Sequence, residues 1–296
     1  MTELIIEPDS EQVGRRIDQV LASAFPEISR TEIQQEIRGG KVLISGEPVL
    51  RPSHRVRGAD CIHWDIPDKP LLTPRRISIP ILYEDSDLVV VDKPSGLVVH
   101  PGAGTTETTL VEGLLIDRAL PVSDDPARPG VVHRLDKETS GVIVVAKTLH
   151  ALESLKRQFS ERSTRKEYIA VVGGLFHEAE GLIDAPIGRD PAMPQRMSIQ
   201  AGGRPSQTEF TVLSEIAGSS LLSVSLHTGR THQIRVHLRY TGHPVLGDEK
   251  YGGAPADRLM LHARRLVIRH PTQGENLEFR APVPDSFPAY AYETLD

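Results

Sequence analysis

The segment from Val131 to Thr148 constrains the fold most, because it places a run of charged residues between two apolar, β-branched runs. The run from Val142 to Ala146 predicts a buried strand, and Val131-Val132 predicts another before the charged residues. The charged residues between them are His133, Arg134, Asp136, Lys137 and Glu138. The pattern therefore predicts a charged loop held by two core strands, and such loops commonly carry catalytic residues.

Two interpretations fit this loop. An aspartate flanked by cationic side chains stays ionised, so Asp136 can act as a nucleophile or a base. The alternative is a solvated turn in which Arg134 and Asp136 form a local ion pair. Composition and spacing leave both open.

The composition bears on compartment and partners. A single cysteine, Cys61, excludes an internal disulfide and fits a reducing compartment. The first ten residues lack the basic start and apolar run of a signal peptide, and no stretch approaches the ~20 apolar residues of a membrane span. We therefore expect a soluble, cytoplasmic protein without membrane association. The net charge of −6 argues mildly against nucleic acid, but phosphate binding depends on local clusters of Lys and Arg.

The chain divides into a small and a large part. Residues 13–65 predict two helices followed by a short hairpin turning at Ser45-Gly46. The first helix buries one face, and the second is capped by Ser29 or Thr31 and stopped by Gly39-Gly40. The buried face of the first helix carries Ile17, Val20, Leu21 and Phe25. Residues 66–80 are Pro-rich and predict a linker, and residues 81–296 predict a large domain.

The large domain is expected to be α+β, with a mixed, mainly antiparallel sheet flanked by helices, beside a small α/β amino-terminal domain. Thr148 is expected to cap a helix whose buried face holds Leu149, Leu152, Leu155 and Phe159. Thr231 is expected to cap a second helix, which ends at Gly242. Expected strands are 88–91, 166–172, 207–216 and 220–228, with an irregular surface loop or hairpin at 180–207.

HRLDKETSG, followed by an apolar strand and a lysine, resembles the signature loop of the RluA-type pseudouridine synthases. Further motifs of that family are matched in order by DKPSGLVVHPG, KEYIAVVGG, GRTHQIRVHL and RLMLHARRL. The order of elements in residues 13–65 resembles an S-four type RNA-binding domain. This layout is most similar to the RluD-like branch, which modifies large-subunit ribosomal RNA, although a transfer-RNA substrate stays open.

The resemblance implies a role for each matched residue. Asp136 is the catalytic carboxylate, Arg235 pairs with it, and Tyr168 stacks on the target base. Substrate is also contacted by Arg134, which fills the gap left by the flipped nucleotide, and by Leu261 beneath it. Arg230 holds phosphates, with Arg239 as the second candidate for that contact. In the small domain the expected RNA contacts are Arg15, Arg30, Arg38 and Lys41.

Pseudouridine formation breaks an N-glycosidic bond, turns the uracil and rejoins it through carbon, with no net redox change or hydrolysis. No cofactor or metal is therefore expected, and the five-residue spacing of His232 and His237 differs from the HxxxH pattern of metal sites. Asp136 either attacks the anomeric carbon or removes a proton from the neighbouring ribose carbon. The rival functions are a non-catalytic RNA-binding or ribosome-assembly protein and a metal-dependent nucleic-acid hydrolase. A monomer is expected.

Overall fold

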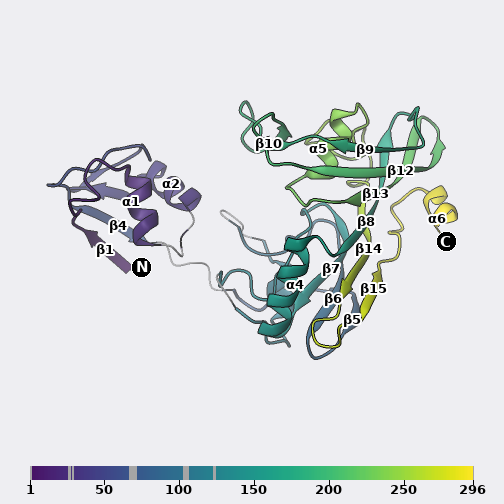
Figure 1. Ribbon diagram of the computed structural model, residues 1–296, viewed down its shortest axis with the longest axis horizontal. Helices are drawn as coiled ribbons and strands as arrows, with labels where there is room; N and C mark the ends of the chain where they lie inside the picture. The colour runs from purple at the N-terminus through teal and green to yellow at the C-terminus, as the bar shows by residue number, and fades with distance from the viewer. Residues whose placement is uncertain are drawn as a thin grey trace. The chain divides into compact units, whose positions relative to one another are not determined.

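The structure is a computed structural model that describes residues 2–25, 28, 30–66, 72–102, 107–122 and 125–295. The chain separates into two compact units (Figure 1). The smaller comprises Met1–Leu72, Pro101–Thr105 and Asp124–Ala127, and the larger Thr73–His100, Thr106–Ser123 and Arg128–Asp296. The boundary between the two units falls within the segment 66–80 that is expected to be a linker. The backbone N–H of Arg75 already donates to the carbonyl of Glu112 at 3.1 Å, inside the larger unit.

The smaller unit packs two helices against a four-stranded antiparallel sheet of order β1-β4-β2-β3. The rings of Phe25 and Trp64 meet edge to face in its core. Ser45 and Gly46 take φ values of 50° and 88°, which confirms the predicted two-residue hairpin turn. The elements are β1 (Thr2–Ile6), α1 (Ile17–Ala24), α2 (Arg30–Arg38), β2 (Val42–Ile44), β3 (Glu47–Pro48) and β4 (Ile62–Ile66).

The start of the second helix of this unit agrees with the first of its two expected caps, Ser29, and not with the second, Thr31. Helix α2 starts at Arg30, so Thr31 lies within the helix and is not its cap. Ser29, the other predicted cap, lies outside the described residues. Gly40 takes a φ of 72° just after the helix, which confirms the predicted Gly39-Gly40 stop.

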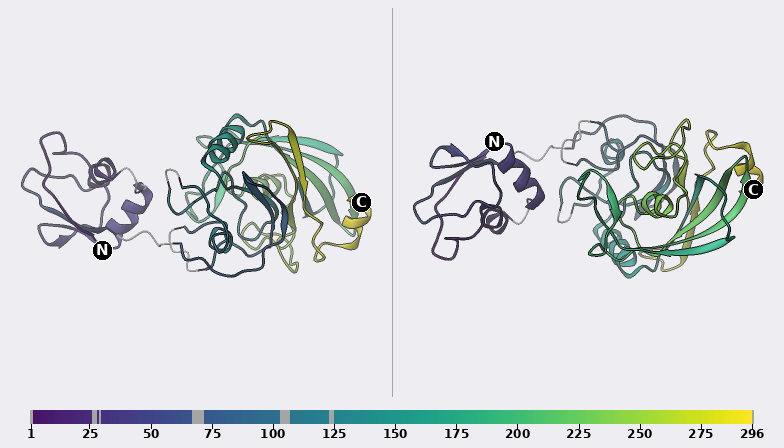
Figure 2. Two further views of the ribbon diagram at one scale, coloured as in Figure 1. Left: turned by 90° about the horizontal axis from the view of Figure 1, so that it is seen from below. Right: turned by 90° about the horizontal axis from the view of Figure 1, so that it is seen from above.

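The larger unit is built on one curved, nine-stranded sheet, shown from two sides in Figure 2. The order is β5-β6-β7-β14-β8-β13-β12-β9, with β15 paired to β14. Among the described strands of this sheet, β7 and β14 pair in parallel and the other pairs are antiparallel. The mixed, mainly antiparallel sheet that the sequence predicts is confirmed.

The strands of the larger unit are β5 (Ile81–Glu84), β6 (Leu88–Lys93), β7 (Ser140–Ala146), β8 (Arg165–Gly173), β9 (Glu180–Asp184), β10 (Ile187–Arg189), β11 (Met197–Ile199), β12 (Gln207–Ile216), β13 (Ser219–Leu226), β14 (Leu261–Arg269) and β15 (Asn276–Arg280). Its helices are α3 (Leu110–Leu114), α4 (Leu149–Glu161), α5 (Gln233–Tyr240) and α6 (Ala289–Leu295). Strands β10 and β11 form a separate hairpin. In the described chain, no helix has the length and apolar character needed to cross a bilayer.

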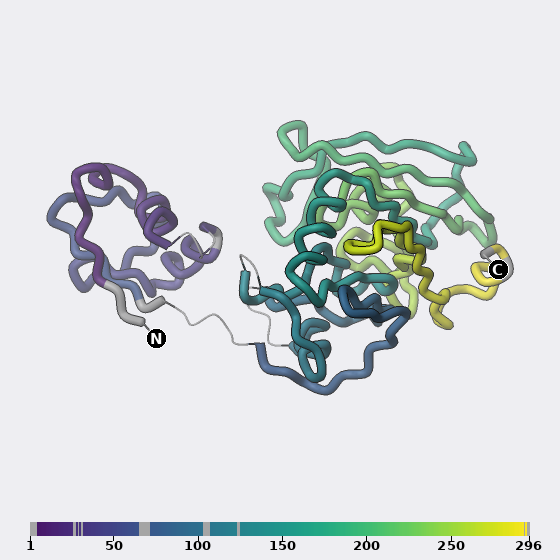
Figure 3. Tube along the Cα trace, turned by 60° about the horizontal axis from the view of Figure 1, so that its bottom comes forward, coloured from purple at the N-terminus to yellow at the C-terminus, as the bar shows by residue number. Residues whose placement is uncertain are grey.

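Helix α4 covers one face of the sheet over β7 and β14. Thr148 caps it as predicted, since its side-chain oxygen accepts the N–H of Ala151 at 3.1 Å. Leu152 and Leu155 enter the core, but the prediction for Leu149 is wrong, because that side chain is 55% exposed and Ala151 takes the buried position of the first turn. The turn between β14 and β15 lies beside α4 (Figure 3).

Three local predictions are corrected. Val131-Val132 forms no strand, only a bridge from Val131 to Val145, because the left-handed backbone of Gly130 (φ 70°) turns the chain across the end of β7. The stretch 180–207 contains the expected hairpin, but β9 joins the main sheet beside β12. Helix α5 is preceded by His232 in the left-handed region without a side-chain cap bond, so Thr231 is not its cap.

Candidate active site

Six predicted site residues meet in one cavity of the larger unit, which we call the catalytic pocket. They come from the charged loop before β7, from β8 and β14, and from the first turn of α5 with the loop before it. The cavity has a volume of about 120 Å³, and its lining includes Arg134, Asp136, Tyr168, Arg230, Arg235 and Leu261. Folding thus gathers side chains that lie far apart in the sequence.

Asp136 faces Arg235 across the catalytic pocket. A terminal nitrogen of Arg235 lies 3.5 Å from Oδ2 of Asp136 and 3.6 Å from Oε2 of Glu138. The side chain of Arg235 is 4% exposed, whereas those of Asp136 and Glu138 are 17% and 52% exposed. The distance to Asp136 exceeds that of a close charge-assisted hydrogen bond, so the aspartate oxygens remain open to a substrate.

The closest partner of Arg235 is Asp248, which the sequence analysis missed. Nε and a terminal nitrogen of Arg235 donate to the two Asp248 oxygens at 2.7 and 2.8 Å, and the Asp248 side chain is fully enclosed. Burial disfavours the charged form of Arg235. The hydrogen bonds to Asp248 and the negative charges of Asp248, Asp136 and Glu138 outweigh burial and raise the pKa of Arg235. The sequence did contain a sign of this partner, because Asp248 ends the stretch that carries the GRTHQIRVHL motif, thirteen residues after Arg235.

Tyr168 and Leu261 supply an apolar wall of the catalytic pocket. They come from the neighbouring strands β8 and β14 and are 8% and 3% exposed. Burial, helped by the negative charge of Asp136, raises the pKa of Tyr168, so its phenol stays neutral. The pair offers an aromatic face and an aliphatic side chain, surfaces that suit a flat base.

Lys93 is fully buried beneath the charged loop that carries Asp136, and the sequence analysis assigned it no role. Burial, then the positive charge of Arg258, lowers the pKa of Lys93 to about 7. Two residues after Lys93, the Oγ of Ser95 donates to the carbonyl of Glu138 at 2.6 Å. The ammonium of Lys93 donates to the carbonyl oxygens of Pro94, Leu97 and Lys137. The DKPSG segment therefore packs under the loop, as the resemblance implied.

Comparison with known proteins identifies this arrangement. The sequence profile of RNA pseudouridylate synthases matches residues 87–240, and that of the S4 domain matches residues 15–62. A protein of Aquifex aeolicus named as an uncharacterized RNA pseudouridine synthase is 43% identical over 96% of this chain and 95% of its own length.

The chain belongs to the RNA pseudouridylate synthase family.

Two further relatives agree with this assignment. Ribosomal large subunit pseudouridine synthase D of Vibrio cholerae is 39% identical over 93% of this synthase and 89% of its own length. The solved structure of human RNA Pseudouridylate Synthase Domain Containing 1 has a TM-score of 0.57 at 30% identity, covering 69% of this chain and 83% of its own. The protein is thus an RNA pseudouridine synthase, an enzyme that isomerises uridine in RNA.

The two other arginines of the pocket are less tightly held than Arg235. Arg134 is exposed, and Arg230 is half-buried. Nε of Arg230 donates to the carbonyl of Pro205 at 3.3 Å, and its backbone N–H donates to Oε1 of Gln233 at 3.0 Å. The synthase therefore presents two guanidinium groups at the pocket that can bind the phosphates of a nucleic acid.

In the S4 domain, Arg30 is engaged by a buried carboxylate. Its Nε and a terminal nitrogen donate to Oδ2 of Asp18 at 3.1 and 2.9 Å. Burial opposes the charge of Asp18, but hydrogen bonds from Arg16, Gln34 and Arg30 outweigh it and lower the pKa of Asp18. Arg30 thus links α2 to α1, and its contact with RNA stays a prediction.

The other three predicted RNA contacts of the S4 domain are exposed. Lys41 pairs with Glu36 at 3.1 Å, and Arg15 donates to Oγ of Ser23 at 3.4 Å. Arg38 lies in the last turn of α2. All three side chains are reachable from solvent, which is a requirement for the predicted role.

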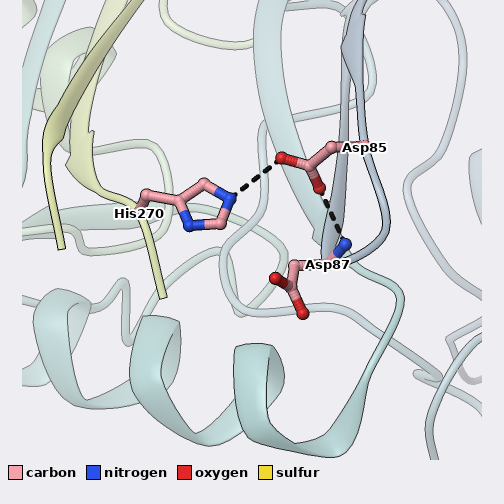
Figure 4. Close-up of side chains that lie close together, drawn as sticks. All are labelled: Asp85, Asp87 and His270. Carbon is pink, nitrogen blue, oxygen red and sulfur yellow. Dashed lines mark hydrogen bonds and ion pairs between the residues drawn. The ribbon is translucent and has the colours of Figure 1, made fainter. Parts of the chain in front are cut away.

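Among the described residues, one group has the ligand types of a metal site: Asp85, Asp87 and His270 (Figure 4). Nε2 of His270 donates to Asp85 at 2.9 Å, and its Nδ1 accepts the backbone N–H groups of Thr272 and Gln273. Because both ring nitrogens are engaged, this group links the β5–β6 turn to the β14–β15 turn and does not offer an imidazole ligand. His232 and His237 are likewise hydrogen-bonded, to Tyr251 and Thr208.

Proposed function

We propose that the synthase modifies uridines of large-subunit ribosomal RNA. Relatives with that substrate in their name match nearly the whole chain, so the likeness includes both the S4 domain and the synthase domain. An S4 domain supplies RNA contacts outside the catalytic pocket, and such contacts suit a large folded RNA. Exposed Arg38 and Lys41 are the side chains of that domain which would meet phosphates.

Asp136 is the catalytic carboxylate in this proposal. The observation that carries it is the 3.5 Å approach of Arg235 to Asp136 in a pocket that also holds Tyr168 and Leu261. The carboxylate either attacks the anomeric carbon of the ribose or removes a proton from the neighbouring ribose carbon. In both routes the N-glycosidic bond breaks and the uracil turns. In the first, its C5 displaces Asp136 from the anomeric carbon, and in the second C5 bonds to that carbon while the neighbouring ribose carbon regains its proton. The C5 hydrogen then leaves as a proton, and N1 takes one up.

The target uridine must leave its stack to reach Asp136, as for other enzymes that act on a base. In the proposal Arg134, exposed beside the pocket, fills the space that the nucleotide leaves. The uracil then stacks on Tyr168 above Leu261, a contact worth roughly 1–3 kcal/mol. Arg230 holds a neighbouring phosphate with the guanidinium nitrogens that do not meet Pro205.

The test is to incubate the purified synthase with unmodified large-subunit ribosomal RNA and to map pseudouridine by carbodiimide treatment and primer extension. Asp136→Asn should abolish the product while RNA binding is kept. Glu138→Gln is the matched control, because Glu138 is a carboxylate at a similar distance from Arg235 but is 52% exposed. Transfer RNA is incubated in parallel, and product from transfer RNA alone would contradict the proposed substrate. Full activity of Asp136→Asn would contradict the role of Asp136 as the catalyst.

We further propose that the enzyme acts as a monomer in the cytoplasm. The six predicted residues of the catalytic pocket come from one chain, so a second copy is not needed to complete it. Light scattering after size-exclusion chromatography tests the first statement, and cell fractionation tests the second. A stable dimer at working concentrations, or recovery outside the cytoplasmic fraction, would contradict them.

A further inference from the structure

A second cavity adjoins the catalytic pocket, and we call it the flanking groove. It has a volume of about 560 Å³ and lies between β11, the carboxyl half of α5 and the turn at 249–252. Its lining includes Arg196, Val236, Arg239, Tyr240, Lys250 and Tyr251. Of these side chains, only Arg239 has a role predicted from the sequence, as a second phosphate contact beside Arg230.

The flanking groove is connected to the catalytic pocket by a shared wall. The ring of Tyr251 lines the groove, and its hydroxyl lies 2.7 Å from Nδ1 of His232, which lines the pocket. Helix α5 contributes Arg235 to the pocket and Tyr240 to the groove. At about 1.5 Å per residue and 3.6 residues per turn these positions lie roughly 7.5 Å apart along the helix and face different sides of it, so the pair of Tyr251 and His232 is the link between the two cavities.

The charges of the flanking groove favour an anion. Among the described residues, Arg196, Arg239 and Lys250 line it and none of them forms an ion pair with a carboxylate. The chain as a whole carries a net charge of −6, so three unpaired cations in one cavity are a local feature. Of the two carboxylates there, Asp190 is used to accept the N–H groups of the β10–β11 turn, and Glu249 is exposed.

The groove also holds an exposed aromatic ring. Tyr240 is the last residue of α5 and is 63% exposed. An aromatic face beside cationic side chains is the combination by which proteins bind single-stranded nucleic acid, with bases stacked on the ring and phosphates near the cations. We propose that the flanking groove binds nucleotides next to the target uridine, with a base on Tyr240 and phosphates on Arg239 and Lys250.

This proposal rests on the proposed function for the identity of the RNA, and it is tested by binding, without catalysis. The probe is a single-stranded oligouridine of about eight nucleotides, and the dissociation constant of the full chain is measured at several salt concentrations. Tyr240→Ala should weaken binding about 5- to 160-fold, the range expected for one lost stack, and Tyr240→Phe should bind as the wild type does. The double change of Arg239 and Lys250 to Ala should reduce the salt slope by about 1.4.

Glu249→Gln is the control of opposite sign. Removing this carboxylate makes the groove more positive, so oligouridine should bind more tightly, whereas general damage to the fold would weaken binding. Wild-type binding by Tyr240→Ala and by the Arg239 and Lys250 double variant would overturn the proposal. If the wild-type synthase did not modify ribosomal RNA, the proposed substrate would be contradicted. The oligouridine measurements would still decide whether the flanking groove binds nucleotides.

Discussion

Arg235 makes its closest hydrogen bonds with Asp248, at 2.7 and 2.8 Å, and lies 3.5 Å from Asp136. A guanidinium beside a free carboxylate tends to close into a two-bond pair. Such a pair would occupy the oxygens of Asp136 that have to reach the sugar. By fixing the plane of the guanidinium, Asp248 lets Arg235 stabilise the charge of Asp136 while its oxygens stay accessible.

Replacing Asp248 by Asn should therefore impair catalysis more than binding. Without the buried carboxylate Arg235 turns toward Asp136, and we expect the single-turnover rate to fall about 10- to 100-fold with little change in RNA affinity. Asp248→Glu should restore part of the rate. A rate and an RNA affinity that fall together, without rescue by Asp248→Glu, would indicate that Asp248 has only a structural role.

Arg235→Lys should lose about 100-fold or more in rate although the positive charge is kept. An ammonium cannot donate side-on to both oxygens of Asp248 while it faces Asp136. Single-turnover measurement on ribosomal RNA checks this, with Arg157→Lys at an exposed position of α4 as the matched control. Wild-type turnover in Arg235→Lys would contradict the role given to the planar group.

Lys93 should make stability rise with pH in the alkaline range. Its pKa is about 7 in the folded chain and 10.5 in the unfolded chain, so between these values the unfolded chain binds more protons and raising the pH stabilises the fold. Urea unfolding at pH 7 and pH 9 should show this slope in the wild type. Lys93→Met should flatten the slope and lower stability, because three backbone carbonyls lose their donor. An unchanged slope in this variant would contradict the assignment.

His133 should also make stability rise with pH, but in the acid range. Burial, then the charge of Lys166, lowers its pKa from 6.5 to about 3, so unfolding takes up a proton in that window and stability falls as the pH drops. Its Nε2 accepts the N–H of Val144 at 3.0 Å, and its ring stacks on Phe159.

His133→Phe should keep the stack, lose about 1–3 kcal/mol at pH 7 for the unsatisfied N–H, and weaken the pH dependence. Urea unfolding between pH 4 and pH 7 measures both effects. The same substitution at exposed His177 is the control. A His133→Phe curve parallel to that of the wild type would show that His133 does not titrate as stated.

Local pattern predicted much of the fold. The buried strand at Val142–Ala146 and the cap at Thr148 follow from β-branched residues and from a hydroxyl before an apolar helix face. Leu149 had the same helical spacing as its buried neighbours, yet the sheet beneath α4 contacts Ala151 instead. Spacing defines a helix face, and the position of the covering sheet decides how much of that face is buried.

By itself, the sequence determined most of the elements and the charged loop, because these depend on residue type and short-range order, and the resemblance of its motifs singled out six pocket residues. Only the tertiary structure decided which carboxylate Arg235 binds. Asp136 and Asp248 lie 99 and 13 positions from it in the chain. The choice between them depends on a difference of less than an ångström between two contacts, which arises from the packing of β7, α5 and the turn after α5.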